Sequence, residues 1–290
     1  MSVRIGDNGG IRIGPETVYG TATVAYVTQN GRSATIAPAK ALLPSARLGS
    51  QNLAVRTYGV GSADGEIELA YDDHRAVIEA LLNATGNLTI NDYTVGDGSV
   101  PDTESVSIWV DYGGSAMEYL GCVVQSLRFE IQPDSPIVVT ASFLGQTVSQ
   151  ESSTALTFPD EADIVWESDI STVSIGGTAM CSLSGTIEVQ IPILGSDRHC
   201  LGGSVIKQPV HAGRSVTTAT LNVELADDTG ADSEAILALF LANNALGDIV
   251  IGDFTLSSCY MTGDGPALGE GITQFPINVE AHELIITTQA

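Results

Sequence analysis

Positive charge is scarce in this chain of 290 residues, which carries 11 lysines and arginines against 35 aspartates and glutamates. The formal net charge is −24. Proteins that wrap nucleic acid contact the phosphates through clusters of lysine and arginine, so this composition argues against specific DNA or RNA binding. Only 16% of the residues are charged and 43% are hydrophobic, which excludes a disordered chain.

Long hydrophobic runs are also missing. The apolar stretches are only a few residues long, whereas a membrane-spanning helix needs roughly 20. The first residues, MSVRIGDNGGIRIG, contain no apolar core of a signal peptide. We therefore expect a chain that stays in the cytosol of the cell that makes it and has no membrane partner.

Cysteine is rare and unclustered, because Cys122, Cys181, Cys200 and Cys259 form no CxxC pair. Scattered cysteines in a cytosolic protein are mostly small buried hydrophobic residues, so we expect free thiols. The alternative is a disulfide that forms after release into an oxidising medium. Cys181 and Cys200 are the two cysteines closest in sequence.

The few cationic residues are unevenly distributed. The segment before Asp64 has a net charge of +4, and the chain from Asp64 onward has −28. Complementary charge guides docking, so residues 1–63 are predicted to be an arm that lies on a second copy. The alternative is a solvated acidic surface with a chance cluster of arginines. The candidate assembly residues are Arg4, Arg12, Arg32, Lys40, Arg47 and Arg56.

Alternation of apolar and polar residues, bounded by Gly, Asn, Asp and Pro, predicts half-buried antiparallel strands along most of the chain. The predicted fold is all-β with two short helices. The strands are expected at Thr21–Val27, Glu66–Tyr71, Ser105–Val110, Val123–Ile131, Ile137–Phe143, Asp169–Ile175, Thr186–Ile191, Thr218–Leu225, Ile249–Leu256 and Thr273–Val279.

Two segments show helical spacing instead. Apolar residues recur at helical intervals over about residues 73–85 and again over about 233–245, each after an acidic cap and before a glycine. Each helix follows a glycine, a polar turn, an alternating strand and an acidic pair, which suggests an internal duplication. We predict domains at 1–147 and 164–290, joined by a polar linker at 148–163.

Motifs that carry chemistry are few. The sequence has no GxSxG, no phosphate-binding loop and no HExxH. Ser204 and Lys207 have the spacing of a serine nucleophile and its base but are expected to lie in a strand, and Glu66 and Glu68 share one strand face as solvated carboxylates. The histidines and the Asp-rich loops fit no metal-ligand pattern. We expect no enzyme, no metal and no cofactor.

Three stretches resemble the tail tube proteins, or major tail proteins, of tailed bacteriophages. They are Pro44–Leu82, with its Arg and Gly-Ser loop before a strand and helix, Tyr119–Gly145, with an aromatic-Gly opening and two strands, and Ala212–Thr217 (AGRSVT). After the last stretch the Gly-Thr usual in the family is replaced by Thr218-Ala219.

The resemblance implies a structural virion protein with two tandem tail-tube-type β-sandwich domains, whose strands form part of a β-barrel lumen on assembly. It also implies rings that stack into a tube, other tail proteins at the tube ends, assembly in the host cytoplasm and passage of DNA during ejection without specific binding. An acidic wall suits that passage because like charge keeps DNA from adhering. The alternative is a β-sandwich binding or decoration module on the virion surface.

The resemblance also implies where rings meet and how many chains close a ring. Residues 28–58 and the loop 92–104 lack their own periodicity and are expected to stack one ring on the next, with Asp97, Asp102 and Glu104 as candidate contacts. Tubes with one tube domain per chain close as hexamers, so two domains per chain favour a trimer with pseudo-sixfold symmetry. A hexamer, with the second half as an outer decoration, is the alternative.

Overall fold

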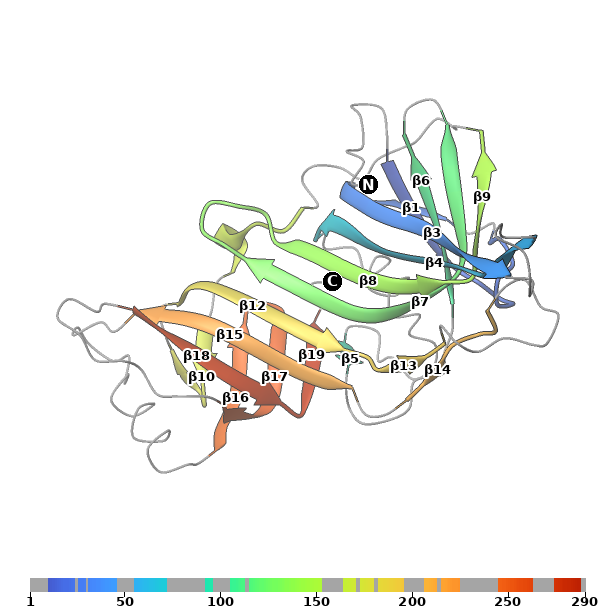
Figure 1. The fold of residues 1–290 in the computed structure, drawn as a ribbon. Helices are drawn as coiled ribbons and strands as arrows, with labels where there is room; N and C mark the ends of the chain where they lie inside the picture. The colour runs from blue at the N-terminus through green and yellow to red at the C-terminus, as the bar shows by residue number, and fades with distance from the viewer. Residues whose placement is uncertain are drawn as a thin grey trace.

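The alternating segments form long antiparallel strands in the computed structural model of the chain (Figure 1). Seventeen strands belong to one extended hydrogen-bonded sheet and two more form a small separate ladder, so the all-β prediction is confirmed. The residues that the structure describes are 10–23, 26–29, 31–45, 55–71, 92–95, 105–112, 115–152, 164–170, 173–179, 182–195, 206–212, 215–224, 245–262 and 274–287.

We call strands β1–β9 the first half and strands β10–β19 the second half. The first half consists of β1 (Gly10–Pro15), β2 (Val27–Gln29), β3 (Gly31–Ser45), β4 (Val55–Ala70), β5 (Asp92–Val95), β6 (Val106–Asp111), β7 (Ala116–Ile131), β8 (Val138–Gly145) and β9 (Thr147–Glu151). The second half consists of β10 (Val173–Ile175), β11 (Thr178–Ala179), β12 (Ser182–Gln190), β13 (Ile193–Leu194), β14 (Val210–His211), β15 (Val216–Glu224), β16 (Ala245–Ile251), β17 (Phe254–Met261), β18 (Gln274–Ala281) and β19 (Glu283–Thr287).

The buried hydrophobic residues form one core that runs through both halves. In a strand, successive side chains point to opposite faces, so Leu127, Phe129 and Ile131 of β7 are buried while Arg128 between them is exposed. Near the centre, the rings of Tyr71 and Phe129 meet that of Phe254 from the second half at 5.4 and 5.0 Å between centroids. Each fully buried aromatic side chain contributes about 2–3 kcal/mol. One hydrophobic core therefore holds the two halves together.

The strand pairings of the first half recur in the second. In the first half they are β1–β2, β1–β6, β3–β4, β4–β8, β6–β7, β7–β8 and β7–β9, and in the second they are β10–β11, β10–β16, β12–β15, β15–β18, β16–β17, β17–β18 and β17–β19. All of these pairings are antiparallel. The two halves therefore share one plan of strand pairing.

Local irregularities also recur, and they fix which residues correspond. The β3–β4 ladder shifts register between Gly31 and Ser33, and the β12–β15 ladder shifts between Ser182 and Ser184. The β6–β7 ladder shifts register between Tyr119 and Cys122, and the β16–β17 ladder shifts between Leu256 and Cys259. Cys122 and Cys259 are therefore counterparts. The residue before each cysteine has a positive φ, 67° at Gly121 and 50° at Ser258.

Two further pairings join the halves. β7 pairs with β12, so that the sheet β3-β4-β8-β7 of the first half continues into β12-β15-β18 of the second. β5, a short strand from the first half, pairs with β19 of the second. Figure 1 shows β7 and β12 side by side between the two groups of strands. The predicted domain limits stay a prediction, and the predicted linker begins inside β9.

Several sequence predictions need correction. Residues 21–23 form no strand, so the strand predicted at Thr21–Val27 is wrong there; residues 24 and 25 lie outside the described residues, and only Val27 belongs to a strand. The strand predicted at Asp169–Ile175 begins instead with a 3-10 turn (Glu167–Asp169) and only then continues as β10. The predicted strand Ile249–Leu256 is a hairpin, because Gly252 with its φ of 54° allows a tight turn between β16 and β17.

Other predictions concern residues that are only partly described. The long loop expected at 28–58 contains most of the β3–β4 hairpin, and the loop expected at 92–104 begins with β5. The predicted helices at 73–85 and 233–245 lie outside the described residues, apart from Ala245, which opens β16. None of the described residues belongs to a helix with the length and hydropathy of a membrane span.

Candidate functional site

A polar face extends across the sheet that joins the halves. Because strand residues alternate between faces, the register places one row of polar side chains side by side on this face. Crossing from β4 to β18, the row reads Glu68, Thr140, Arg128, Glu188, Thr218 and Glu280. The opposite face of the same strands carries buried residues such as Ile67, Phe129 and Leu221. The polar face is therefore a solvated surface that belongs to both halves.

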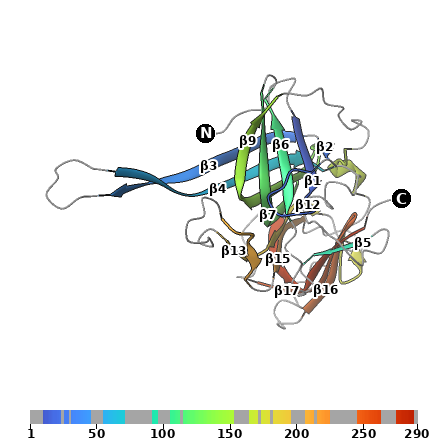
Figure 2. The ribbon, with the colours of Figure 1, turned by 90° about the vertical axis from the view of Figure 1, so that its right-hand side faces the viewer.

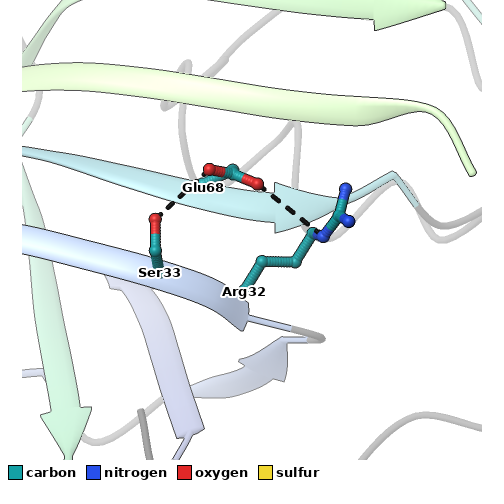
Figure 3. Close-up of polar contacts among 3 residues, drawn as sticks. All are labelled: Arg32, Ser33 and Glu68. Carbon is teal, nitrogen blue, oxygen red and sulfur yellow. Dashed lines mark hydrogen bonds and ion pairs between the residues drawn. The ribbon is translucent and has the colours of Figure 1, made fainter. Parts of the chain in front are cut away.

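Ion pairs organise part of this face. The Arg32 Nε atom lies 3.7 Å from Glu68 Oε1, and the Ser33 hydroxyl donates to Glu68 Oε2 at 3.3 Å (Figure 3). Arg128 and Glu130 form a closer pair at 2.7 Å. These side chains are about a third to a half exposed, so each pair contributes at most about 1 kcal/mol. Their role is to shape the charge of the face rather than to hold the fold together.

A shallow depression of about 500 Å³ lies on the polar face. Its lining is almost wholly polar and charged, and includes Glu66, Glu68, Arg128, Glu130 and Glu188. Small-molecule sites are instead mostly apolar with a few polar groups. The depression therefore has the chemistry of an open surface rather than of a substrate pocket.

Negative charge outweighs positive charge on this face. The acidic residues of the face are Asp64, Glu66, Glu68, Glu130, Glu188 and Glu280, and the basic ones are Arg32 and Arg128. Partial burial raises the pKa of Asp64 above its usual value. At neutral pH the face repels polyanions, while salt screens that repulsion beyond about 8–10 Å.

The candidates for catalysis are not brought together. Glu66 and Glu68 do share one face, as the sequence predicted, but they stand among polar residues of an open sheet. Lys207 lies outside any strand, which corrects the strand expected at Ser204–Lys207, and Ser204 is outside the described residues. Among the described residues, no group of three or more His, Cys, Asp or Glu side chains could hold a metal ion.

The structure describes four of the predicted assembly residues. Arg12 in β1 stacks over Trp109 with its guanidinium carbon 5.9 Å from the ring centroid. Arg32 is exposed at the start of β3 and pairs with Glu68, while Lys40 in β3 and Arg56 in β4 lie on the long hairpin. The remaining predicted residues, Arg4, Arg47, Asp97, Asp102 and Glu104, lie outside the described residues.

Sequence reasoning missed a buried carboxylate. Glu16 is only 7% exposed, and it accepts hydrogen bonds from the Gly20 and Gly121 amides and from Ser105 and Ser107, at 2.5–2.8 Å. A buried charge is tolerated when it is fully hydrogen-bonded. Glu16 thus fastens the end of β1 to β6 and β7. The residue itself carries no pattern by which the sequence could have identified it.

Both described cysteines behave as expected. Cys122 and Cys259 are free and buried. Burial raises the pKa of the Cys122 thiol well above its usual value and that of Cys259 to about 12. Both are therefore neutral and unreactive in the folded chain. Cys181 and Cys200 lie outside the described residues.

A twice-used antiparallel plan and one continuous, polar, open sheet face define a subunit built from extended antiparallel sheet. Comparison with known families agrees, because the model of the family described as phage tail tube protein matches residues 6–281. The chain belongs to the phage tail tube protein family and is a structural component of the virion tail. No curated protein matches the sequence.

Proposed function

We propose that three copies of this chain close into a ring, that rings stack into a tube, and that the polar sheet face lines the channel through which DNA leaves the virion. Membership of the family supports self-association into a tube. The observation that carries the proposal is the continuous polar face, which crosses from the first half to the second through β7 and β12.

The repeated pairings support three chains per ring. Each half supplies one four-strand block to the sheet, β3-β4-β8-β7 in the first and β12-β15-β18-β17 in the second. If each block is one tube-type unit, a ring of six units needs three chains. The domains proposed at 1–147 and 164–290 are these two units, and their role is structural rather than catalytic.

The charge of the face supports a channel for DNA. Six acidic and two basic side chains line it, so it offers phosphate no site of attraction. An open sheet edge also needs a partner, since unpaired backbone groups invite strand addition. Closure of the ring satisfies the edges of the sheet and places the polar face on the inside.

Electron microscopy of the purified chain tests the ring directly. We expect stacked rings with threefold symmetry and six similar features around the channel. Six whole chains per ring would contradict the trimer, and a monodisperse monomer at high concentration would contradict the tube itself.

Binding of short double-stranded DNA to assembled tubes tests the channel. Glu66 lies on the polar face and Glu151 at the end of β9, outside that face, and both are exposed. Glu66→Lys should make the tubes retain DNA in low salt, because it reverses charge where DNA passes. Equal retention by the matched control Glu151→Lys would show that the polar face does not line the channel.

A further inference from the structure

A segment of the second half covers one end of the first. The Ile191 amide, just beyond β12, donates to the Gln125 carbonyl at 2.7 Å and extends the β7–β12 ladder. Farther along, the Gln146 side chain donates to the Ile206 carbonyl at 3.1 Å, and the Tyr19 hydroxyl donates to the Lys207 carbonyl at 3.4 Å. Residues 191–195 and 206–209 therefore cover the place where β7, β8 and β9 meet.

The covered first-half residues are deeply buried. Val123 and Leu144 are each 3% exposed. Gly195 packs so closely that a Cβ added to it would lie 2.8 Å from Leu144 Cδ2. Val123 and Leu144 pair with each other in the β7–β8 ladder, and Leu144 also pairs with Asp64 of β4.

The corresponding place in the second half is open. There Thr218 of β15 pairs with Glu280, and Glu280 pairs with Tyr260, so Tyr260 and Glu280 are the counterparts of Val123 and Leu144. Tyr260 is 58% exposed, and Glu280, Thr262 and His282 are exposed as well. None of the described residues covers this patch, which we call the Tyr260 patch.

The repeat also supplies a counterpart of the covering segment. Gln190 pairs with Val216 in the second half, and the matching pair in the first half is Ala39 with Ser62. Lys40 thus corresponds to Ile191, and the outer part of the β3–β4 hairpin corresponds to β13 and β14, which follow β12 and precede β15. In the first half, however, this element extends away from the body as a long ribbon (Figure 2).

The outer ribbon has partners only within itself. β4 pairs with β8 from Ala63 to Ala70, whereas the ladder between residues 39–45 and 55–62 is bordered by no other described strand. A lone two-stranded hairpin is only marginally stable in water, so the ribbon needs a surface to lie on. Residues 37–62 contain Lys40, Arg47 and Arg56 and no acidic residue, which favours an acidic surface.

We propose that the β3–β4 ribbon of one copy lies on the Tyr260 patch of the next copy, in the way that residues 191–195 and 206–209 lie on the first half of their own chain. This inference rests on the proposed ring and names the contact that joins its chains. The pairing Ile191 to Gln125 becomes Lys40 of one copy to Thr262 of the next. The basic ribbon then passes Tyr260, Glu280 and His282 at one edge of the polar face. The exposed tyrosine becomes buried, and the other five acidic residues of that face stay open to the channel.

Cysteine cross-linking in assembled full-length protein tests this register. A chain carrying both Lys40→Cys and Thr262→Cys should form disulfides between chains on mild oxidation, since adjacent antiparallel residues have the Cα separation of roughly 4.5–5.5 Å that a disulfide accepts. Non-reducing gels should show loss of monomer and a series of covalent oligomers. Each single variant, and Lys40→Cys combined with Thr220→Cys two strands away, should remain monomeric on the gel.

An internal control tests the repeat itself. Gln125→Cys with Ile191→Cys should cross-link within one chain and leave the mass of a monomer, because these residues already pair in the structure. If tubes form but the Lys40 and Thr262 pair does not cross-link, or the Thr220 pair links equally well, the proposed contact is wrong while the ring stands. If electron microscopy shows no rings, the proposed function fails and this contact fails with it.

Discussion

The two halves of the molecule share their strand pairings but differ in how their matching positions are occupied. At the junction of β7 and β8, Val123 is buried and its partner Leu144 packs against Gly195 of the second half, whereas Tyr260, the counterpart of Val123, is exposed. In the first half the buried carboxylate of Glu16 accepts a hydrogen bond from the Gly121 amide. In the second half the exposed carboxylate of Asp248 accepts one from the Ser258 amide. The shared backbone plan sets the architecture, and the side chains determine which contacts stay within a chain.

The sharpest test of this comparison places a negative charge at Val123 in one variant and at its counterpart Tyr260 in another. Val123→Glu buries an unpaired carboxylate and should lower the free energy of unfolding by about 4 kcal/mol or more. Tyr260→Glu stays exposed and should change it by less than about 0.5 kcal/mol, yet prevent tube assembly. Urea denaturation and electron microscopy measure the two effects. Tubes of normal length from Tyr260→Glu would remove the assembly role of this patch.

The next largest effect concerns the two carboxylates. Glu16→Ala leaves three buried donors and the half-buried Gly20 amide without their acceptor and should cost about 3 kcal/mol. Asp248→Ala removes an exposed acceptor of the Ser258 amide and should cost about 1 kcal/mol. Chemical denaturation of both variants measures the difference. Equal losses would mean that the Glu16 network is no stronger than its counterpart.

A smaller difference should come from the two residues with positive φ. Gly121→Ala adds a Cβ that would lie 2.8 Å from Gln146 Cβ at a φ of 67°, so it should cost about 2 kcal/mol. Ser258→Gly removes the strain of a φ of 50° but adds chain entropy to the unfolded state, so it should change stability by less than about 0.5 kcal/mol. Thermal unfolding of each variant provides the measurement, and a stable Gly121→Ala protein would contradict the close packing at this turn.

The smallest effect at neutral pH concerns the matched thiols. Burial raises the pKa of Cys259 to about 12 from its usual 9.0, so the neutral thiol is favoured in the folded state. This contribution is complete below pH 9 and is lost as the pH rises from 9 to about 12. At pH 8, peptide mapping after alkylation should find Cys122 and Cys259 unmodified until urea unfolds the chain. Rapid labelling of either in the folded protein would show that its half opens locally.

The sequence predicts best those strands that lie with one face on the core and one in water. Glu66 and Glu68 alternate with Ile67 and Leu69, so β4 could be predicted over this stretch. The outer ribbon could not, since APAKALLPS has no period of two and its strands face no core. The hairpin at Gly252 was also missed, because apolar residues continue on both sides of a two-residue turn.

The candidate site was predictable only within single strands. That Glu66 and Glu68 share a face follows from their spacing of two. Their neighbours across the sheet, such as Arg128 and Glu188, come from strands far away in sequence, and no local pattern determines which strands pair. Glu16 was missed for the same reason, because all but one of its hydrogen-bond donors lie about 90 or more residues away.

The short strand β5 has a consequence for how the molecule comes apart. It belongs to the first half but pairs with β19 of the second, which gives the halves a second hydrogen-bonded connection in addition to the β7–β12 ladder. Neither half can peel away under load without breaking ladders at two separate places. The chain should therefore yield to mechanical force as one cooperative body.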